Sequence, residues 1–133
     1  MQPHTLISSG TVWEKKFGYS RAVAVGNMIF VAGTTAVDEH GTVMGRDDPY
    51  EQAVYIYRKI ERALKEAGAT LKDVVRVRTF VTDIKRWELV AKAQGEFFAD
   101  IRPAATLVEV TALVNPELLV EIEVDAIKST ADG

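Results

Sequence analysis

Two short apolar runs, at residues 21–25 and 28–34, are separated by Gly26 and Asn27. Glycine and asparagine adopt positive φ angles at little cost, so this pair between two apolar runs is typical of a β-hairpin. Residues 38–41 have the composition of the turn that would follow. We therefore expect two antiparallel strands in this part of the chain.

A helical pattern begins at Asp48. This residue can cap a helix, Pro49 suits the first helical position, and Glu51 stands where a capping box closes. The apolar residues that follow recur at helical spacing and form one stripe: Ala53, Ile56, Tyr57, Ile60, Ala63, Leu64 and Ala67. Gly68 is the residue type that commonly follows a helix C-terminus. The pattern predicts an amphipathic helix between Asp48 and Gly68.

A second helix is predicted to start at Asp83 and to end before Pro103. Its expected apolar side consists of Trp87, Val90, Ala91, Gln94, Phe97 and Phe98. Three other segments, 74–81, 106–112 and 118–127, alternate with a period of two, which is typical of strands.

This alternation gives the predicted sheet two unlike faces. One face takes residues such as Val75, Val77, Thr79 and Val81 and would receive the helices. The other carries Arg76, Arg78, Glu109, Glu121, Glu123 and Asp125, interleaved with Phe80, Leu107 and Leu119. This second face is either exposed to solvent or a surface between subunits, where patches of mixed charged and apolar residues are common. The order strand-strand-helix-strand-helix-strand-strand indicates an α+β fold with two helices on one sheet face.

The chain has 133 residues, which suggests a single domain over residues 1–133. Its net charge is −3 and it has no basic run, so nucleic acid is not an expected partner. No apolar stretch reaches the ~18 residues of a membrane helix, and the first residues lack the pattern of a signal peptide. We therefore expect a cytoplasmic protein without a membrane partner.

The chain is poor in cysteine and histidine, two residue types that commonly act as nucleophiles or metal ligands. There is no cysteine, which excludes thiol catalysis and Cys-based zinc sites. Histidine occurs only at His4 and His40, so a multi-histidine metal site is not expected within one chain. Neither a phosphate-binding glycine loop nor a G-x-S-x-G nucleophile motif is present.

Two strand carboxylates are the remaining candidates. A desolvated Glu121 or Glu123 could act as a general acid or base. The alternative is a structural ion pair with Arg76 or Arg78 on the same face. Tyr19 lies in a turn-like stretch before a strand, where it either closes over a ligand or anchors the loop.

Six segments in this order resemble the YjgF/RidA family of reactive intermediate deaminases, whose members are also labelled endoribonuclease L-PSP. They are 18–20 (GYS), 25–33 (VGNMIFVAG), 73–83 (DVVRVRTFVTD), 97–98 (FF), 102–110 (RPAATLVEV) and 120–123 (VEIE). The resemblance implies a chorismate-mutase-like fold and a homotrimer, whose sheets form a central barrel with the helices outside.

The resemblance also implies three ligand clefts between subunits, with Tyr19 of one chain near Ala105 and Glu121 of a neighbour. Glu121 matches the glutamate that activates water, so it is the candidate catalytic residue. Tyr19 and the backbone amides near Gly33 and Leu107 would position a small-molecule ligand. No metal or organic cofactor is implied, because general acid–base chemistry suffices to add water to a C=N bond.

The chain departs from the deaminase branch at the arginine that binds the substrate carboxylate in that branch. Ala105 stands in its place, and alanine has no donor. Ala32 and Ala91 likewise stand where that branch has polar residues. Arg102 is the nearest replacement, but an offset of three would turn it to the opposite face of an extended strand.

Three functions follow from these observations. The first is hydrolysis of an imine, an enamine or a related carbonyl compound by Glu121, with substrates that lack a carboxylate favoured by Ala105. The second is a non-catalytic trimer that binds a metabolite or another protein. The third, cleavage of RNA, is disfavoured by the acidic balance of the chain.

Overall fold

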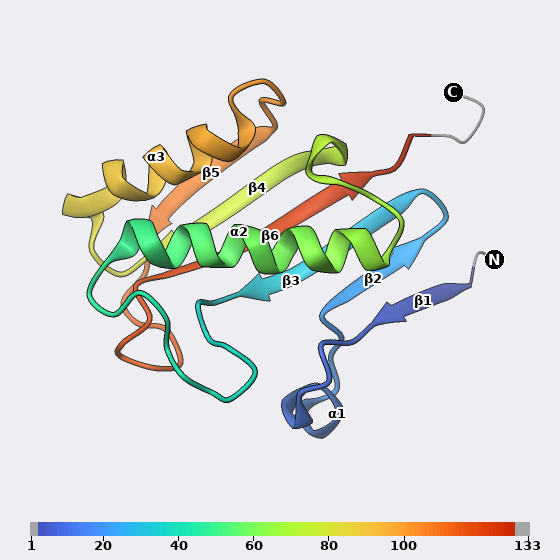
Figure 1. Ribbon diagram of the computed structural model, residues 1–133, viewed down its shortest axis with the longest axis horizontal. Helices are drawn as coiled ribbons and strands as arrows, with labels where there is room; N and C mark the ends of the chain where they lie inside the picture. Colours follow the sequence, from blue (N-terminus) through green and yellow to red (C-terminus); the bar gives the residue numbers. More distant parts are fainter. Residues whose placement is uncertain (1–2, 130–133) are drawn as a thin grey trace.

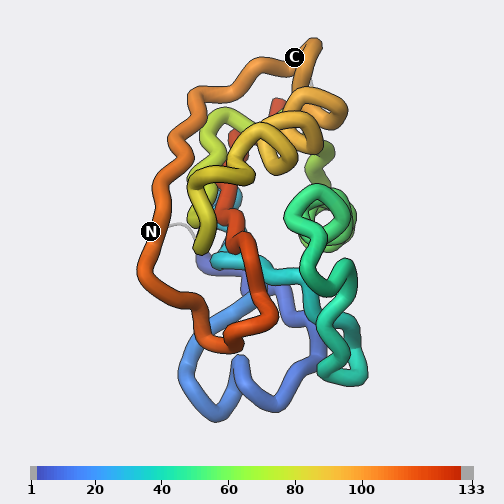
Figure 2. The backbone as a smooth tube through the Cα atoms, turned by 90° about the vertical axis from the view of Figure 1, so that its left-hand side faces the viewer, coloured from blue at the N-terminus to red at the C-terminus, as the bar shows by residue number. Residues whose placement is uncertain are grey.

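The computed structural model describes residues 3–129 and shows one mixed sheet with two long helices on one face (Figures 1 and 2). The strands are β1 (His4–Ile7), β2 (Ala22–Val25), β3 (Met28–Thr34), β4 (Val74–Val81), β5 (Ala104–Glu109) and β6 (Val120–Ile127). Their order in the sheet is β1-β2-β3-β6-β4-β5. Only β4 and β5 are parallel among these neighbours. The expected α+β architecture is confirmed.

The predicted hairpin joins β2 to β3. Val25 pairs with Met28, and Gly26 has a φ of 59°, which a residue with a side chain rarely adopts. The hairpin is therefore closed by the two residues that the apolar pattern left between the strands, as predicted.

Helix α2 (Pro49–Glu66) also has its predicted bounds. The Asp48 side chain accepts a hydrogen bond from the Glu51 amide at 3.1 Å, and Gly68 follows the helix with a φ of 83°. The apolar stripe is fully buried at Ile56, Tyr57 and Ile60. Burial of this stripe against the sheet stabilises the helix more than its intrinsic propensity does.

The second helix differs from its prediction at its start. Asp83 caps a 3-10 turn, η2 (Ile84–Arg86), and α3 (Trp87–Phe98) begins only after it. Because a 3-10 turn has 3.0 residues per turn, it rotates the phase of the helix that follows. Trp87 is consequently 46% exposed, and Ala93 is buried instead. The Tyr57 ring contacts the Phe98 ring, with centroids 5.3 Å apart, and so joins α2 to α3.

The predicted sheet faces were wrong at Val75 in β4, although residues 76–81 face as predicted, and they were wrong for Leu107 and Glu109 in β5. The pairing of β4 with β6 skips Val75, which is 44% exposed, so that Val74 is buried in its place. This is a β-bulge, and it adds one residue to the alternation. In β5, Leu107 pairs with buried Thr79, which places Leu107 and Glu109 on the helix side rather than among the charges.

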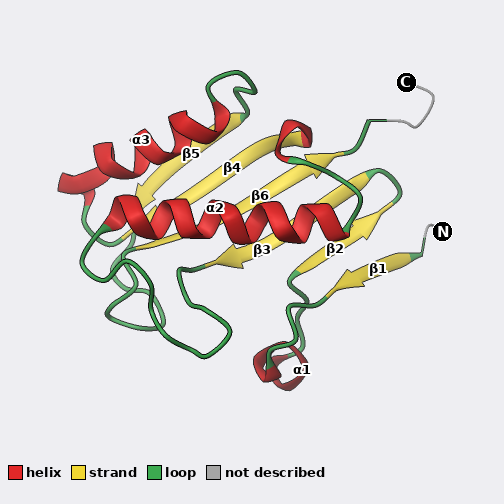
Figure 3. Cartoon of the chain, in the orientation of Figure 1, coloured by secondary structure: helices red, strands yellow, loops and turns green. Residues whose placement is uncertain are grey.

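Two elements were absent from the sequence-based expectation. Strand β1 pairs with β2 at one edge of the sheet, and α1 (Val12–Phe17) lies in the connection between them, away from α2 and α3 (Figure 3). Strand β1 is only four residues long, and α1 only six, which is too short for a periodic signal. Among the described residues, no helix is both long and apolar enough to cross a membrane.

Candidate functional site

The face of the sheet that the helices leave open carries a ladder of charges. It consists of Glu121, Glu123 and Asp125 on β6, with Arg78 beside them on β4. The Arg78 Nη1 atom lies 3.4 Å from Glu123 Oε1 and 3.3 Å from Asp125 Oδ2. Glu123 and Asp125 therefore have a structural cation between them, as the ion-pair alternative predicts for Glu123.

Glu121 has a different environment. Its side chain lies directly over Gly33 of β3, where a Cβ atom would overlap its carboxylate and come within 3.0 Å of its Cδ atom. The absence of a side chain at Gly33 is thus what leaves room for the Glu121 carboxylate. Burial raises the pKa of Glu121, nearby Glu123 raises it further, and the Arg21 guanidinium opposes both effects.

Arg21 is a site residue that the sequence did not reveal. Its Nη2 atom donates a hydrogen bond to the Gly33 carbonyl at 2.5 Å. The guanidinium is therefore held against β3, the strand over which the Glu121 side chain lies. Burial lowers the Arg21 pKa, while Tyr19, Glu14 and Glu121 act to raise it. The only sequence signal was its place two residues after Tyr19.

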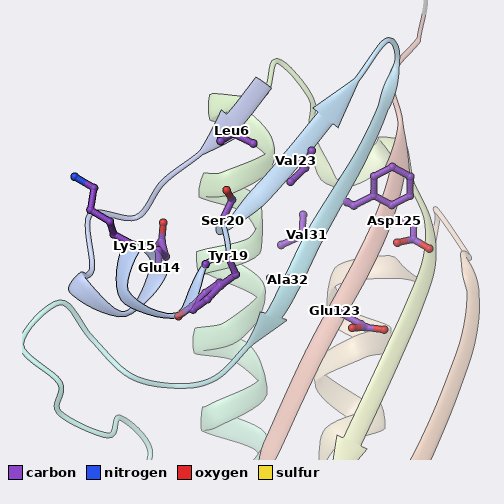
Figure 4. A pocket seen from close by; sticks show the side chains of 12 residues that line it. Leu6, Glu14, Lys15, Tyr19, Ser20, Val23, Val31, Ala32, Glu123 and Asp125 are labelled. Carbon is purple, nitrogen blue, oxygen red and sulfur yellow. The ribbon is translucent and has the colours of Figure 1, made fainter. Parts of the chain in front are cut away.

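A hollow of about 740 Å³ opens on this face between the N-terminal segment and β6 (Figure 4). Its lining includes Glu14, Tyr19, Val23, Ala32, Glu123 and Asp125. Tyr19 and Glu14 lie on one side of the hollow, and the two β6 carboxylates lie on the other (Figure 4).

Glu14 fixes the segment that carries Tyr19. Its carboxylate is buried and accepts hydrogen bonds from the Ser9 amide at 3.1 Å and the Thr11 hydroxyl at 3.3 Å. Burial acts to raise the Glu14 pKa, but these and other serine hydrogen bonds outweigh it and lower the pKa. The Gly18 and Tyr19 amides then donate to the Glu14 carbonyl, each at 2.9 Å. Tyr19 is therefore held at the rim, with 43% of its surface exposed.

The other candidate residues lie elsewhere in the same chain. Ala105 pairs with Val77 and Leu107 with Thr79, on the edge strand β5 at the far side of the sheet from β1. Tyr19 and Gly33, in contrast, lie on the β1 side. One chain therefore brings Glu121 against Gly33 and places Tyr19 at the hollow, whose lining includes neither of these two residues, and it does not bring Ala105 or Leu107 to them.

Arg102 is also far from Glu121 within the chain. It is exposed in the loop before β5, with a φ of 59°. The register places the start of β5 beside Arg76, whereas Glu121 lies beside Phe80, four positions further along β4. At about 3.3 Å per residue, this is more than 10 Å along the strands. Arg102 therefore does not supply the missing cation to Glu121 of its own chain.

No group of three or more His, Asp or Glu side chains within residues 3–129 is arranged to hold a metal ion. The arrangement offers instead one desolvated carboxylate, one neighbouring guanidinium and a tyrosine at the rim of a hollow. These groups can transfer protons and orient a small polar ligand.

Comparisons with known proteins find a family model and relatives that cover most of the chain. The family model described as endoribonuclease L-PSP matches residues 13–128. A protein of the RutC family from Pyrococcus abyssi is 36% identical over 83% of this chain and 86% of its own length. A Streptomyces coelicolor protein described as uncharacterized is 35% identical over 96% of this chain and 94% of its own.

A solved structure extends the similarity to three dimensions. The crystal structure of a Mycobacterium tuberculosis member of the YjgF/YER057c/UK114 family has 49% sequence identity to this chain. It superimposes with a TM-score of 0.85 over 94% of this chain and 99% of its own. The fold seen here is therefore the chorismate-mutase-like fold of that family.

Proposed function

Because the chain belongs to the endoribonuclease L-PSP family, also known as the YjgF/RidA family, we propose that it hydrolyses a C=N bond with Glu121 as the proton-transfer group. The observation that supports this role is the contrast between Glu121 and its neighbours. Glu123 and Asp125 are each within 3.4 Å of Arg78, whereas Glu121 lies over the bare Gly33 backbone and burial raises its pKa. A carboxyl group with a raised pKa is suited to give and take protons near neutral pH.

The proposed reaction needs one water molecule. The Glu121 carboxylate takes a proton from water as the water oxygen attacks the imine carbon, and the C=N π electrons move to nitrogen. The carboxyl group then protonates the nitrogen, which gives a carbinolamine. The Glu121 carboxylate takes the proton of the new hydroxyl group and passes it to the amine, so that the C–N bond breaks and a carbonyl compound and ammonia leave. The reaction is balanced, because one imine and one water molecule give one carbonyl compound and one ammonia, and the Glu121 carboxylate is regenerated.

The site is proposed to be completed by a second copy of the chain in a homotrimer. The open sheet face supports this, because large apolar side chains lie exposed on it: Leu6 at 65%, Phe30 at 41% and Val108 at 43%. The same arrangement would bring the β5 edge of one chain, with Ala105 and Leu107, toward Tyr19 and Glu121 of another.

We expect the protein to be a stable trimer in solution, with about three times the mass of the 14.7 kDa chain. Light scattering coupled to size exclusion measures this directly. Phe30→Glu should dissociate the assembly, because it adds a fourth carboxylate beside Asp125, its partner in the pairing of β3 with β6. Glu61→Gln on the exposed side of α2 is the control and should leave the mass unchanged. A monomeric wild type would overturn the proposed composite site.

The proposed substrates lack a carboxylate. Ala105 has no donor for such a group. Among the described residues that line the hollow beside Tyr19, Lys15 is the one cation, and the neighbouring Arg78 is already shared by Glu123 and Asp125. This arrangement offers little to bind a carboxylate and favours neutral imines.

We therefore expect slow hydrolysis of 2-iminoacrylate-type compounds and faster hydrolysis of matched imines without the carboxylate. Ala105→Arg should raise the kcat/KM for the carboxylate-bearing imine by about tenfold or more, since a charge-assisted hydrogen bond contributes ~1.5–3 kcal/mol. Ammonia release from freshly generated imines gives both rates. Val114→Arg, in the exposed loop after β5, adds the same charge and is the control that should change little. Rapid hydrolysis of the carboxylate-bearing imine by the wild type would contradict this substrate class.

Non-catalytic ligand binding is the second candidate, and the apolar positions Ala32, Ala91 and Ala105 favour it. It predicts saturable binding of a small carbonyl compound to the trimer with no turnover. RNA cleavage is the weakest of the three, because the chain carries a net charge of −3.

A further inference from the structure

A second cavity lies on the other side of the sheet from Glu121, between the segment after β1 and helix α2. It has a volume of about 150 Å³ and is lined by Ile7, Ser8, Ser9, Arg21, Lys59, Arg62, Ala63 and Glu66. At ~30 Å³ per water molecule, it has room for about five waters or for one small ion with part of its hydration shell.

Lys59 is the best-fixed cation in this cavity. Its Nζ atom donates to the Thr35 carbonyl at 2.7 Å and to the Val37 carbonyl at 2.8 Å. An ammonium group has three donors, so one N–H is left for a further acceptor. Burial lowers the Lys59 pKa to about 8, and the charges of Arg21 and Arg62 lower it in the same direction.

Arg21 contributes a second donor that lacks a partner. Its Nη2 atom is used by the Gly33 carbonyl, but its Nε–H is buried and has no hydrogen-bond acceptor among the described residues. An unpaired buried N–H costs about 1–3 kcal/mol, so an acceptor near it would be stabilising. Arg21 lines the second cavity, and its unpaired Nε–H is itself buried from solvent.

The charges around this cavity are unbalanced. Arg21, Lys59 and Arg62 meet one lining carboxylate, Glu66, and none of these three cations forms an ion pair within the described part of the chain. Outside the cavity, Glu14 and Glu121 act on Arg21, and Asp38 acts on Lys59. Lys59, Arg62 and Glu66 recur at intervals of three and four residues, so α2 presents all three on the same side. Ser8 and Ser9 add hydroxyl groups at the rim.

We propose that this cavity binds a phosphate-class dianion, either free phosphate or the terminal phosphoryl group of a small molecule. Three clustered cations are neutralised better by a dianion than by a single carboxylate. Lys59 and Arg62 on α2 and Arg21 just before β2 line the cavity, so donors from two elements can contact the several oxygens of a tetrahedral ion. The cavity lies on the helix side of the sheet and shares Arg21 with the Glu121 site, but the proposed anion binding does not depend on the proposed hydrolysis.

Titration calorimetry of the wild-type protein with inorganic phosphate tests the proposal. We expect saturable binding at phosphate concentrations below about 10 mM, together with a rise in Tm, because a ligand that binds only the folded state stabilises it. Methyl phosphate separates the two sources: equal binding assigns the site to a phosphoryl group, and binding of inorganic phosphate alone assigns it to the free ion. Absence of saturable binding of either compound would overturn the proposal.

Arg62→Gln is the informative variant, because Arg62 is exposed and its loss should not impair folding. It should weaken phosphate binding by about tenfold, the value of one charge-assisted hydrogen bond. Lys65→Gln removes the same charge from the same helix outside the cavity and is the matched control. Equal weakening by both variants would reduce the effect to general electrostatics and overturn the site.

Nuclear magnetic resonance of the Lys59 side chain supplies a second readout. The charged groups that act on this ammonium are Arg21, Arg62 and, in the turn after β3, Asp38, and Glu66 on the same helix also lines the cavity. A bound dianion should raise the Lys59 pKa above its value of about 8, so phosphate affinity should fall as the pH rises through that range. An unchanged Lys59 titration at saturating phosphate would place the ion elsewhere and overturn the site.

Discussion

Glu121→Gln is expected to reduce imine hydrolysis by at least about 100-fold while the protein stays folded and trimeric. Loss of a general acid–base group lowers rates by ~10²–10⁴-fold, and glutamine keeps the size of the side chain but cannot exchange the proton. Single-turnover kinetics on a carboxylate-free imine should show the loss in kcat rather than in KM.

The stability of this variant follows from the sign of the pKa shift. Burial raises the Glu121 pKa, so between the ordinary glutamate pKa and the raised value the folded protein binds more protons than the unfolded chain. Its contribution to stability is therefore greatest at low pH and declines as the pH rises through the raised pKa. Glutamine is not ionised, so the variant avoids the free-energy cost of burying a charged carboxylate. Its free energy of unfolding should therefore lie within about 1 kcal/mol of the wild-type value at neutral pH.

Glu123→Gln is the matched control, because it makes the same change two positions away on the same face. It removes a partner of Arg78, whose Nη1 atom lies 3.4 Å from Glu123 Oε1, and leaves the Glu121 carboxylate in place. It should loosen the assembly before it affects hydrolysis. If both variants lowered stability equally and neither altered turnover or ligand affinity, Glu121 would be structural and the proposed enzyme would lose its proton-transfer group.

The parts of the fold that were predictable have local causes. Helix α2 is specified by Asp48, Pro49 and Gly68 together with a continuous apolar stripe, and the hairpin by Gly26 between two apolar runs. Each signal lies within a few residues of the structure that it determines. Such elements agree with their tertiary environment, so sequence and structure coincide there.

The errors arose where long-range pairing overrides local alternation. A bulge at Val75 adds one residue to β4, and no residue in that run of valine and arginine marks it. Strand β5 is set by its parallel register with β4, which turns Leu107 toward the helices. Alternation predicts that two faces exist but does not decide which face meets the core.

The residues of the candidate site also divide into those with a signal in the local sequence and those that depend on long-range contacts. Glu121 and Tyr19 were candidates from their positions in a strand and a turn, and the family resemblance supplied their expected roles and that of Gly33. Arg21 escaped notice, because its significance lies in the contact with the Gly33 carbonyl, which only the approach of β2 to β3 produces. A basic residue before a strand carries no sign of that contact in the sequence.

Gly33→Ala should abolish most of the hydrolysis without touching a reactive group. The new Cβ atom would occupy the position of the Glu121 carboxylate, so that side chain must move away from the strand. Gly33 does not have a positive φ, and the displaced group is the end of a flexible side chain, so the unfolding free energy should change by only about 1 kcal/mol. We expect a fall in kcat of about 100-fold, since a misplaced catalytic group costs nearly as much as an absent one.

A double-mutant cycle distinguishes displacement of Glu121 from general damage. In the Glu121→Gln background, Gly33→Ala should cause little further loss of activity, because both changes act on the same carboxylate. Gly95→Ala on α3 is the matched control: its Cβ would have no atom within 4 Å, and alanine should stabilise that helix by up to about 1 kcal/mol with no effect on hydrolysis. Full activity in Gly33→Ala would show that the contact between Glu121 and the bare β3 backbone is not what positions the proton-transfer group.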